Sequence, residues 1–181
     1  MLSVPQANIL PQFIDPRQLA KQGATLTGQI DPDLCNRLAE AVIKISEPII
    51  SSLVFYVKDS GRKAIHIKSS TTVLVSCHRC LDAMSLPLQC DTIIGIVWTE
   101  DEAGTLPKEL DPWIVAEEGD IAELLEDELL LALPFVIYHD ETACSVNLGS
   151  LSSEKEFNEK IDSPKNPFEV LRELKDSIFD K

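Results

Sequence analysis

Long apolar runs are missing from this chain of 181 residues. Its longest apolar stretches, such as Leu129 to Val136, are much shorter than the roughly 18 residues that a membrane-spanning helix needs. The segment from Met1 to Pro16 also lacks the basic start and the continuous apolar centre of a secretory signal. We therefore expect a cytoplasmic protein with no membrane contact.

Basic residues are scarce as well. The chain has 16 Lys and Arg against 30 Asp and Glu, which gives a formal charge of −14 at pH 7. Nucleic-acid binding normally depends on Lys and Arg side chains that neutralise phosphates, so this balance disfavours a protein that wraps RNA. Such a charge favours encounter with a basic protein partner, although solubility alone explains it equally well.

Catalytic motifs are the third absence. The sequence contains no Gly-x-Ser-x-Gly motif, no glycine-rich phosphate loop and no His-Glu-x-x-His zinc helix. None of the three histidines stands near an obvious nucleophile motif. We predict that the protein is not an enzyme.

The residues that are present predict a folded domain that begins with short helices. A hydrophobic fraction of 44% is enough for a core in one domain. Asp15-Pro16 and Asp31-Pro32 each predict a helix start, because Asp caps the first turn and proline suits its first position. A strand from Thr25 to Ile30 is predicted between the two helices.

The apolar period changes to two after Ile49, which predicts a hairpin around the turn Asp59-Ser60-Gly61. The second arm runs to Cys77, and a third strand follows from Leu86 to Trp98. Consecutive strands with short connections favour antiparallel pairing. The expected fold class is therefore α+β, with short helices flanking an antiparallel sheet that could close into a barrel-like form.

An exposed acidic loop is predicted from Glu100 to Asp111. An amphipathic helix capped by Asp120 follows, with most of its acids on a solvated face, and Pro134 ends it. We expect a single α+β domain over 1–144. Over 145–181 we expect a polar linker or mobile arm and a C-terminal helix that needs a surface on which to dock.

The five cysteines are an odd number, which in the cytosol favours reduced thiols or metal ligation over a disulfide framework. Cys77 and Cys80 have the spacing of half a tetrahedral zinc site. Cys144 and His139 could complete the site if the segment after the acidic helix folds back, and Cys90 is a competing ligand. Reduced structural thiols and a redox pair are the alternatives, but redox pairs typically begin a helix.

Four motifs follow one another along the chain: Val75 to Leu81, Glu126 to Pro134, His139-Asp140 with Cys144, and Asn166 to Leu171. In residues, order and separation these motifs resemble the YceD family, and the resemblance covers nearly the whole chain.

The resemblance implies a role in the synthesis, processing or stability of large-subunit (23S) ribosomal RNA, without an assigned catalytic activity. It also places the family's cysteine pair on Cys77 and Cys80 and its later cysteine on Cys144. His139 is then the fourth ligand to test for a structural zinc, and Cys35 and Cys90 have no place in the pattern.

Acidity without enzyme motifs, taken with the resemblance, favours a ribosome biogenesis factor that contacts ribosomal proteins or the immature large subunit. Direct binding to ribosomal RNA and a redox role for a zinc or thiol protein are the alternatives. RNA binding would need a basic patch, for which the only clustered candidates are Lys58, Arg62, Lys63 and Lys68. The expected partner-binding residues are Glu100, Asp101, Glu102, Glu117 and Glu118.

Overall fold

The computed structural model describes residues 8–140 and 142–146. The predicted C-terminal helix, and all of the predicted linker after residue 146, lie outside the described residues. No helix in the described part is long and apolar enough to cross a membrane.

The first predicted helix is confirmed as α1 (Pro16–Gln22). The Asp15 carboxylate accepts hydrogen bonds from the backbone N–H groups of Arg17 and Gln18, and Gly23 ends the helix with a φ of +63°. That left-handed conformation suits glycine because it has no Cβ.

The helix predicted after Asp31 is split into two pieces. A 3-10 turn, η1 (Pro32–Leu34), is followed by α2 (Asn36–Ala41), and Cys35 lies between them in a non-helical conformation. The break turns the chain so that both Cys35 and Leu38 are fully buried. Burial of these two side chains overrides the continuous helical pattern of the sequence.

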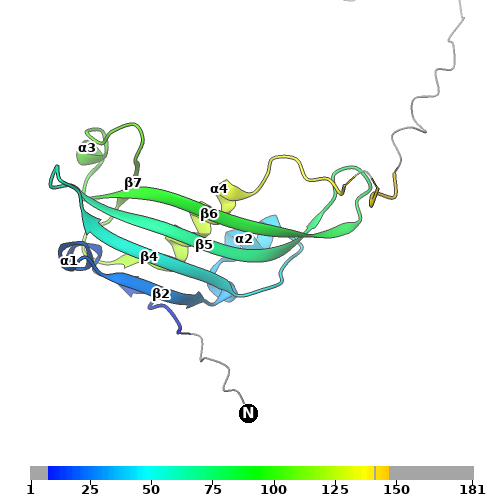
Figure 1. Ribbon diagram of the computed structural model, residues 1–181, viewed down its shortest axis with the longest axis horizontal. Coiled ribbons are helices and arrows are strands. Elements are labelled where there is room, and N and C mark those ends of the chain that lie inside the picture. The colour runs from blue at the N-terminus through cyan, green and yellow to red at the C-terminus, as the bar shows by residue number, and fades with distance from the viewer. Residues whose placement is uncertain (1–7, 141, 147–181) are drawn as a thin grey trace, which may run out of the picture. The chain divides into compact units, whose positions relative to one another are not determined.

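The main sheet has six strands and is open, with β2 (Thr25–Ile30) and β7 (Asp111–Ile114) at its edges (Figure 1). Between them lie β4 (Ile49–Val57), β5 (Lys63–Ser76) and β6 (Ala83–Val97). The pairings among β2, β4, β5 and β6 are antiparallel, as predicted. The short strand β3 (Lys44–Ile45) also pairs with β5, outside this linear order. Strands β1 (Phe13–Ile14) and β8 (Gly119–Asp120) pair with each other in a separate sheet.

The segment predicted as an acidic loop contains regular structure. It begins with α3 (Glu100–Ala103), whose first turn is capped by the Thr99 hydroxyl, and it leads into β7. Because α3 and the residues after it carry the chain back along the sheet, β7 pairs with β6 in the parallel direction. The predicted exposure is confirmed for most of this segment, but the prediction that it is a loop was wrong where α3 and the start of β7 lie.

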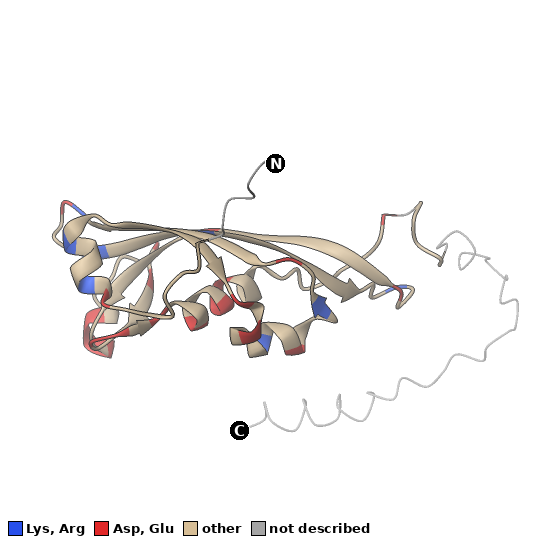
Figure 2. Cartoon of the chain, turned by 90° about the horizontal axis from the view of Figure 1, so that it is seen from below, with Lys and Arg blue, Asp and Glu red and all other residues tan. Residues whose placement is uncertain are grey.

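Helices α2 and α4 (Ile121–Ala132) cover one face of the sheet (Figure 2). Helix α4 confirms the predicted helix, with Asp120 accepting hydrogen bonds from the N–H groups of Ala122 and Glu123. The core forms where this helix meets the strands. Its fully buried side chains include Leu53, Phe55, Ile65, Ile67, Leu125 and Leu129.

Two acids of α4 are buried, in contrast to the predicted solvated face. Glu126 is 4% exposed and Glu128 is 8% exposed. Glu126 accepts hydrogen bonds from the Leu38 N–H (3.0 Å) and from Nε of Arg37 (2.8 Å), and Glu128 accepts one from the Thr92 hydroxyl (2.8 Å). Helix α2 has no side-chain cap from its own N-cap residue, so Glu126 supplies that cap from α4.

Candidate metal centre

The cysteine pair lies in the turn that joins β5 to β6. Cys77 donates its N–H to the Asp82 carbonyl (2.9 Å), and Leu81 donates its N–H to the Cys77 carbonyl (2.9 Å). Leu81 is the one described residue other than glycine with a positive φ, at 65°. A leucine in this region costs on the order of 1–3 kcal/mol, so the turn is held in a shape that the backbone alone does not prefer.

The segment after α4 folds back to this turn. His78 donates its N–H to the Ile137 carbonyl (2.8 Å), and Ile137 donates its N–H to the His78 ring nitrogen Nδ1 (3.4 Å). A turn at Asp140, whose carbonyl accepts from the N–H of Cys144 (3.1 Å), then brings that cysteine toward the same place. Cys144 and His139 could complete the site only if the chain folded back after α4, and the structure shows that it does.

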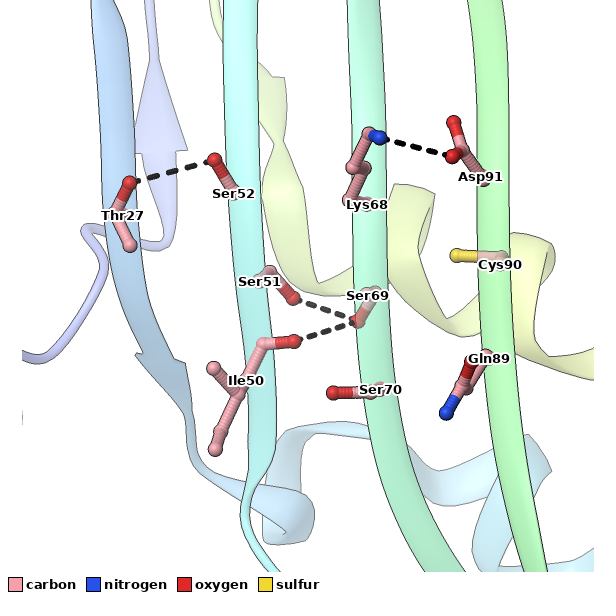
Figure 3. A pocket seen from close by; sticks show the side chains of 10 residues that line it. All are labelled: Thr27, Ile50, Ser51, Ser52, Lys68, Ser69, Ser70, Gln89, Cys90 and Asp91. Carbon is pink, nitrogen blue, oxygen red and sulfur yellow. Dashed lines mark hydrogen bonds and ion pairs between the residues drawn. The ribbon is translucent and has the colours of Figure 1, made fainter.

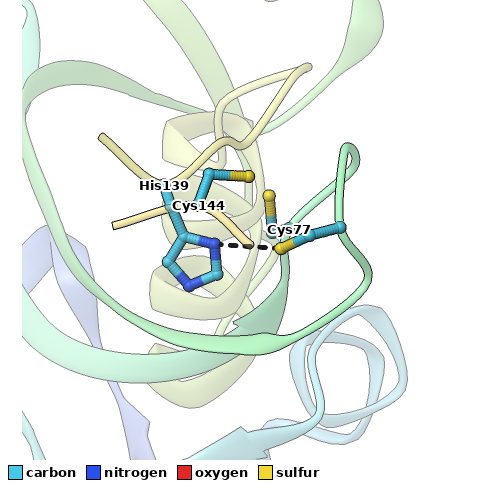
Figure 4. A group of neighbouring side chains, drawn as sticks. Cys77, His139 and Cys144 are labelled. Atoms are coloured by element: carbon cyan, nitrogen blue, oxygen red, sulfur yellow. Dashed lines mark hydrogen bonds between the residues drawn. The ribbon is translucent and has the colours of Figure 1, made fainter. Parts of the chain in front are cut away.

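Cys77, Cys80, His139 and Cys144 meet at the hairpin end, and their ligand atoms all lie within 4.8 Å of one another. Figure 4 shows Cys77, His139 and Cys144 facing one another. The Cys80 sulfur is 3.3 Å from Nδ1 of His139. A tetrahedral zinc with Zn–S bonds of about 2.3 Å needs neighbouring sulfurs about 3.8 Å apart, so these donors fit such an ion with small adjustments.

The thiols of this cluster have opposite tendencies to ionise. Burial opposes ionisation of Cys77, but the backbone N–H groups of Cys80, His139 and Arg79 stabilise the thiolate and lower the pKa of Cys77 to about 5. Burial raises the pKa of Cys80, and the neighbouring thiols of Cys77 and Cys144 add to that effect. A cation among these sulfurs would remove the repulsion between thiolates, because metal binding favours the deprotonated form.

Cys35 and Cys90 are not part of the cluster. Cys90 pairs with Ser69 in the middle of the β5–β6 ladder, seven residues from Ala83 at the turn. At about 3.3 Å per residue this places it about 23 Å along the strand, so it is not the competing ligand that the sequence allowed. Burial raises the pKa of each of these two thiols to about 11.

The acidic residues predicted to bind a partner are all exposed. Val97, the last residue of β6, pairs with Ile114, the last residue of β7, so the acids that follow the two strands leave the sheet at the same end. The Glu102 carboxylate also accepts the Trp98 N–H (2.9 Å). Within the described ranges these acids form no ion pair. The group comprises Glu100, Asp101, Glu102, Glu117 and Glu118.

The clustered basic residues have contacts within the protein. Arg62 donates to the Thr105 carbonyl (3.2 Å), and the Lys63 ammonium lies over the Trp98 ring, 4.8 Å from its centre. Lys68 pairs with Asp91 at 3.0 Å. These side chains therefore do not form one free basic surface.

A hollow of about 540 Å³ lies on the face of the sheet opposite α2 and α4 (Figure 3). The Ser51 and Ser69 hydroxyls are 2.7 Å apart, and the Ser69 hydroxyl also donates to the Ile50 carbonyl (3.3 Å). Lys68 and Asp91 neutralise each other across two strands. The Thr27 and Ser52 hydroxyls, which also line the hollow, are 3.4 Å apart, so most of its polar side chains have partners within the protein.

The fold and the site define an α+β protein with an open, helix-backed sheet and a Cys3His cluster at one hairpin end. Among the described residues this is the one group of three or more potential metal ligands. The chain belongs to the YceD family. The family model of the large ribosomal RNA subunit accumulation protein YceD matches residues 65–175.

A curated relative supports the same assignment. The large ribosomal RNA subunit accumulation protein YceD of Haemophilus influenzae is 31% identical over 171 residues, which cover 92% of this chain and 96% of the relative. No solved structure matches the chain significantly.

Proposed function

We propose that this chain is a non-catalytic, cytoplasmic factor that supports the accumulation of large-subunit ribosomal RNA during ribosome biogenesis. The observation that carries this proposal is the match to a relative named for that accumulation, over 92% of this chain and 96% of the relative. The absence of catalytic motifs from the sequence fits a factor that binds and stabilises.

Contact with basic ribosomal proteins is the proposed means. The acidic surface formed by Glu100, Asp101, Glu102, Glu117 and Glu118 supports it, because these side chains are exposed at one end of the sheet. A concentrated negative charge speeds encounter with a basic protein and reduces the repulsion among the positive charges of that protein. Salt screens such an attraction beyond roughly 8 to 10 Å at physiological ionic strength.

Direct binding to ribosomal RNA is the second candidate. The basic residues that would contact RNA are Lys58, Arg62, Lys63 and Lys68. Three of them, Arg62, Lys63 and Lys68, already contact groups within the protein. The strongly negative total charge also opposes approach to phosphates. Protein contacts therefore have the better support.

A structural zinc held by Cys77, Cys80, Cys144 and His139 is the proposed cofactor. Three thiolates and one imidazole suit zinc, and four protein ligands leave no open position for a reacting water. The ion would fasten the β5–β6 turn to the segment after α4. A redox role for the thiols is less favoured, because the pair opens no helix and leads directly into β6.

The test recovers the tagged full chain from growing cells at low and moderate salt and identifies bound proteins and RNA. One variant replaces Glu100, Asp101, Glu102, Glu117 and Glu118 with the corresponding amides. Its matched control replaces the same number of exposed acids elsewhere in the protein, namely Asp33, Glu40, Glu47, Asp59 and Glu123.

Loss of ribosomal proteins and lower large-subunit RNA in the first variant, with both retained in the control, supports the proposed surface. Unchanged recovery and RNA levels in the folded first variant contradict it. Precursor RNA that remains bound after removal of other proteins favours the direct RNA candidate.

A further inference from the structure

The two residues between the paired cysteines, His78 and Arg79, both contact the segment that carries His139. His78 holds both backbone polar groups of Ile137: its N–H donates to the Ile137 carbonyl (2.8 Å), and its ring Nδ1 accepts the Ile137 N–H (3.4 Å). His78 is next to Cys77 in sequence, yet its Nδ1 faces a backbone N–H. It is therefore not a member of the cluster of ligand atoms.

Arg79 holds the next two residues of the segment. Its guanidinium donates to the His139 carbonyl (3.2 Å) and lies over the Tyr138 ring, 5.1 Å from the ring centre. The His78 ring meets the same tyrosine edge-on, with centres 6.5 Å apart. Ile137, Tyr138 and His139 are therefore each contacted by His78 or Arg79.

These contacts matter because, within residues 135–140, Ile137 is the one side chain that packs against the hydrophobic core. The segment forms no helix or strand, and its side chains Phe135, Val136 and Tyr138 are 99%, 48% and 53% exposed. Packing against the core therefore restrains them weakly. His139 is also 59 residues from Cys80, so local chain geometry cannot bring these two ligands together.

We propose that His78 and Arg79 are positioning residues that hold His139 within reach of the three cysteines and so complete the metal centre. This inference rests on the zinc centre proposed above. Residues that orient a ligand without touching the metal typically change metal affinity about 10- to 100-fold when they are removed.

The experiment measures zinc affinity of the full chain by competition with a chelator, under reducing conditions, for the natural protein, Arg79→Ala and His78→Ala. We expect about 10- to 100-fold weaker zinc binding in each variant. Arg62→Ala is the matched control. Like Arg79, Arg62 lies at a hairpin turn and donates to a distant backbone carbonyl, that of Thr105, but its turn joins β4 to β5. It should bind zinc like the natural protein.

Cobalt substitution separates positioning from a general loss of stability, because its visible absorption reports the ligands of the ion. Arg79→Ala should shift this spectrum toward that of His139→Ala, and Arg79→Lys should restore part of it by keeping the positive charge. Circular dichroism identifies the variants that fold. If Arg79→Ala does not fold, the zinc affinity and cobalt spectrum of Arg79→Lys are compared with those of the natural protein instead.

The outcomes distinguish the two proposals. A natural protein that binds no zinc overturns both the metal centre and the positioning role. Stoichiometric zinc with unchanged affinity and an unchanged cobalt spectrum in Arg79→Ala and His78→Ala overturns the positioning role alone.

Discussion

The five cysteines occupy two regions: Cys35 and Cys90 are buried in the core, whereas Cys77, Cys80 and Cys144 lie together at the hairpin end. In the core, burial raises the pKa of Cys35 and Cys90 to about 11, so both thiols stay neutral and pack as small apolar groups. At the hairpin end, backbone N–H groups lower the pKa of Cys77 to about 5, against the effect of its burial. Burial raises the pKa of Cys80 in the same turn, so the backbone N–H groups around its sulfur, more than its place in the fold, distinguish Cys77 from the other thiols.

The polar groups of the two regions also differ. In the core, Glu126 and Glu128 accept hydrogen bonds from defined neighbours, so they are satisfied within the protein. At the hairpin end, three sulfurs and one imidazole face one another. The buried acids of the core thus have their hydrogen-bond partners within the protein, whereas the donor atoms at the hairpin end are arranged so that a bound cation would stabilise them.

The largest effect is expected for Cys77→Ser, which should weaken binding at the proposed zinc centre. A structural zinc is worth about 10–16 kcal/mol over its four ligands, so one thiolate contributes about 3 kcal/mol. Zinc affinity should fall roughly 100-fold, as measured by chelator competition. Equal zinc affinity in Cys77→Ser and the natural protein would remove this cysteine from the ligand set.

The next effect is expected in the core, at Glu126. Replacing it with Ala leaves the buried Leu38 N–H without its acceptor and removes a partner of Arg37, so unfolding should cost about 2 kcal/mol less. Urea denaturation measures this change, and zinc affinity should stay the same. Glu126→Gln, which keeps an acceptor oxygen, should lose less. A change in Glu126→Ala below about 0.5 kcal/mol would mean that the cap is not important.

A smaller effect is expected for Cys90→Ser. The hydroxyl is more polar than the thiol and is buried beside β5, which should lower the free energy of unfolding by about 1 kcal/mol. Zinc content, measured by metal analysis, should match that of the natural protein. Loss of zinc from this variant would break the distinction between the two groups of cysteines.

The smallest effect is expected on the sheet surface, at Asp91. Hydrogen bonds from His66 and then Lys68 lower the pKa of this carboxyl, although its side chain is 61% exposed. A lowered pKa stabilises the fold above the ordinary Asp value of about 3.9, and this contribution is lost as pH falls through the folded value. Asp91→Asn should therefore flatten the dependence of stability on pH below about pH 4, as acid titration of unfolding would measure. A steeper dependence would contradict the assignment.

Features set by neighbouring residues could be predicted from the sequence. Asp15-Pro16 and Gly23 define both ends of α1, and the turn after β4 follows from Asp59-Ser60-Gly61. Features set by distant residues could not. The parallel pairing of β7 depends on the path of the chain through α3, and the burial of Glu126 depends on a donor in α2.

The candidate site combines both kinds of information. The spacing of Cys77 and Cys80 indicates half of a metal site without any structure, because both thiols lie in one turn. The choice of the remaining ligands depends on where the chain returns after α4. His78 contacts Ile137 and Arg79 contacts His139, across 59 and 60 residues of the chain. Contacts over such separations could not be predicted from the sequence.

The cap that Glu126 provides has a consequence for how the protein is made. Leu38 precedes Glu126 by 88 residues, so at roughly 5–20 residues per second the ribosome adds the capping residue about 4 to 18 seconds later. A helix of six residues is too short to persist alone. Helix α2 must therefore wait for α4, and the two helices should form together near the end of synthesis of this domain, although they are far apart in the chain.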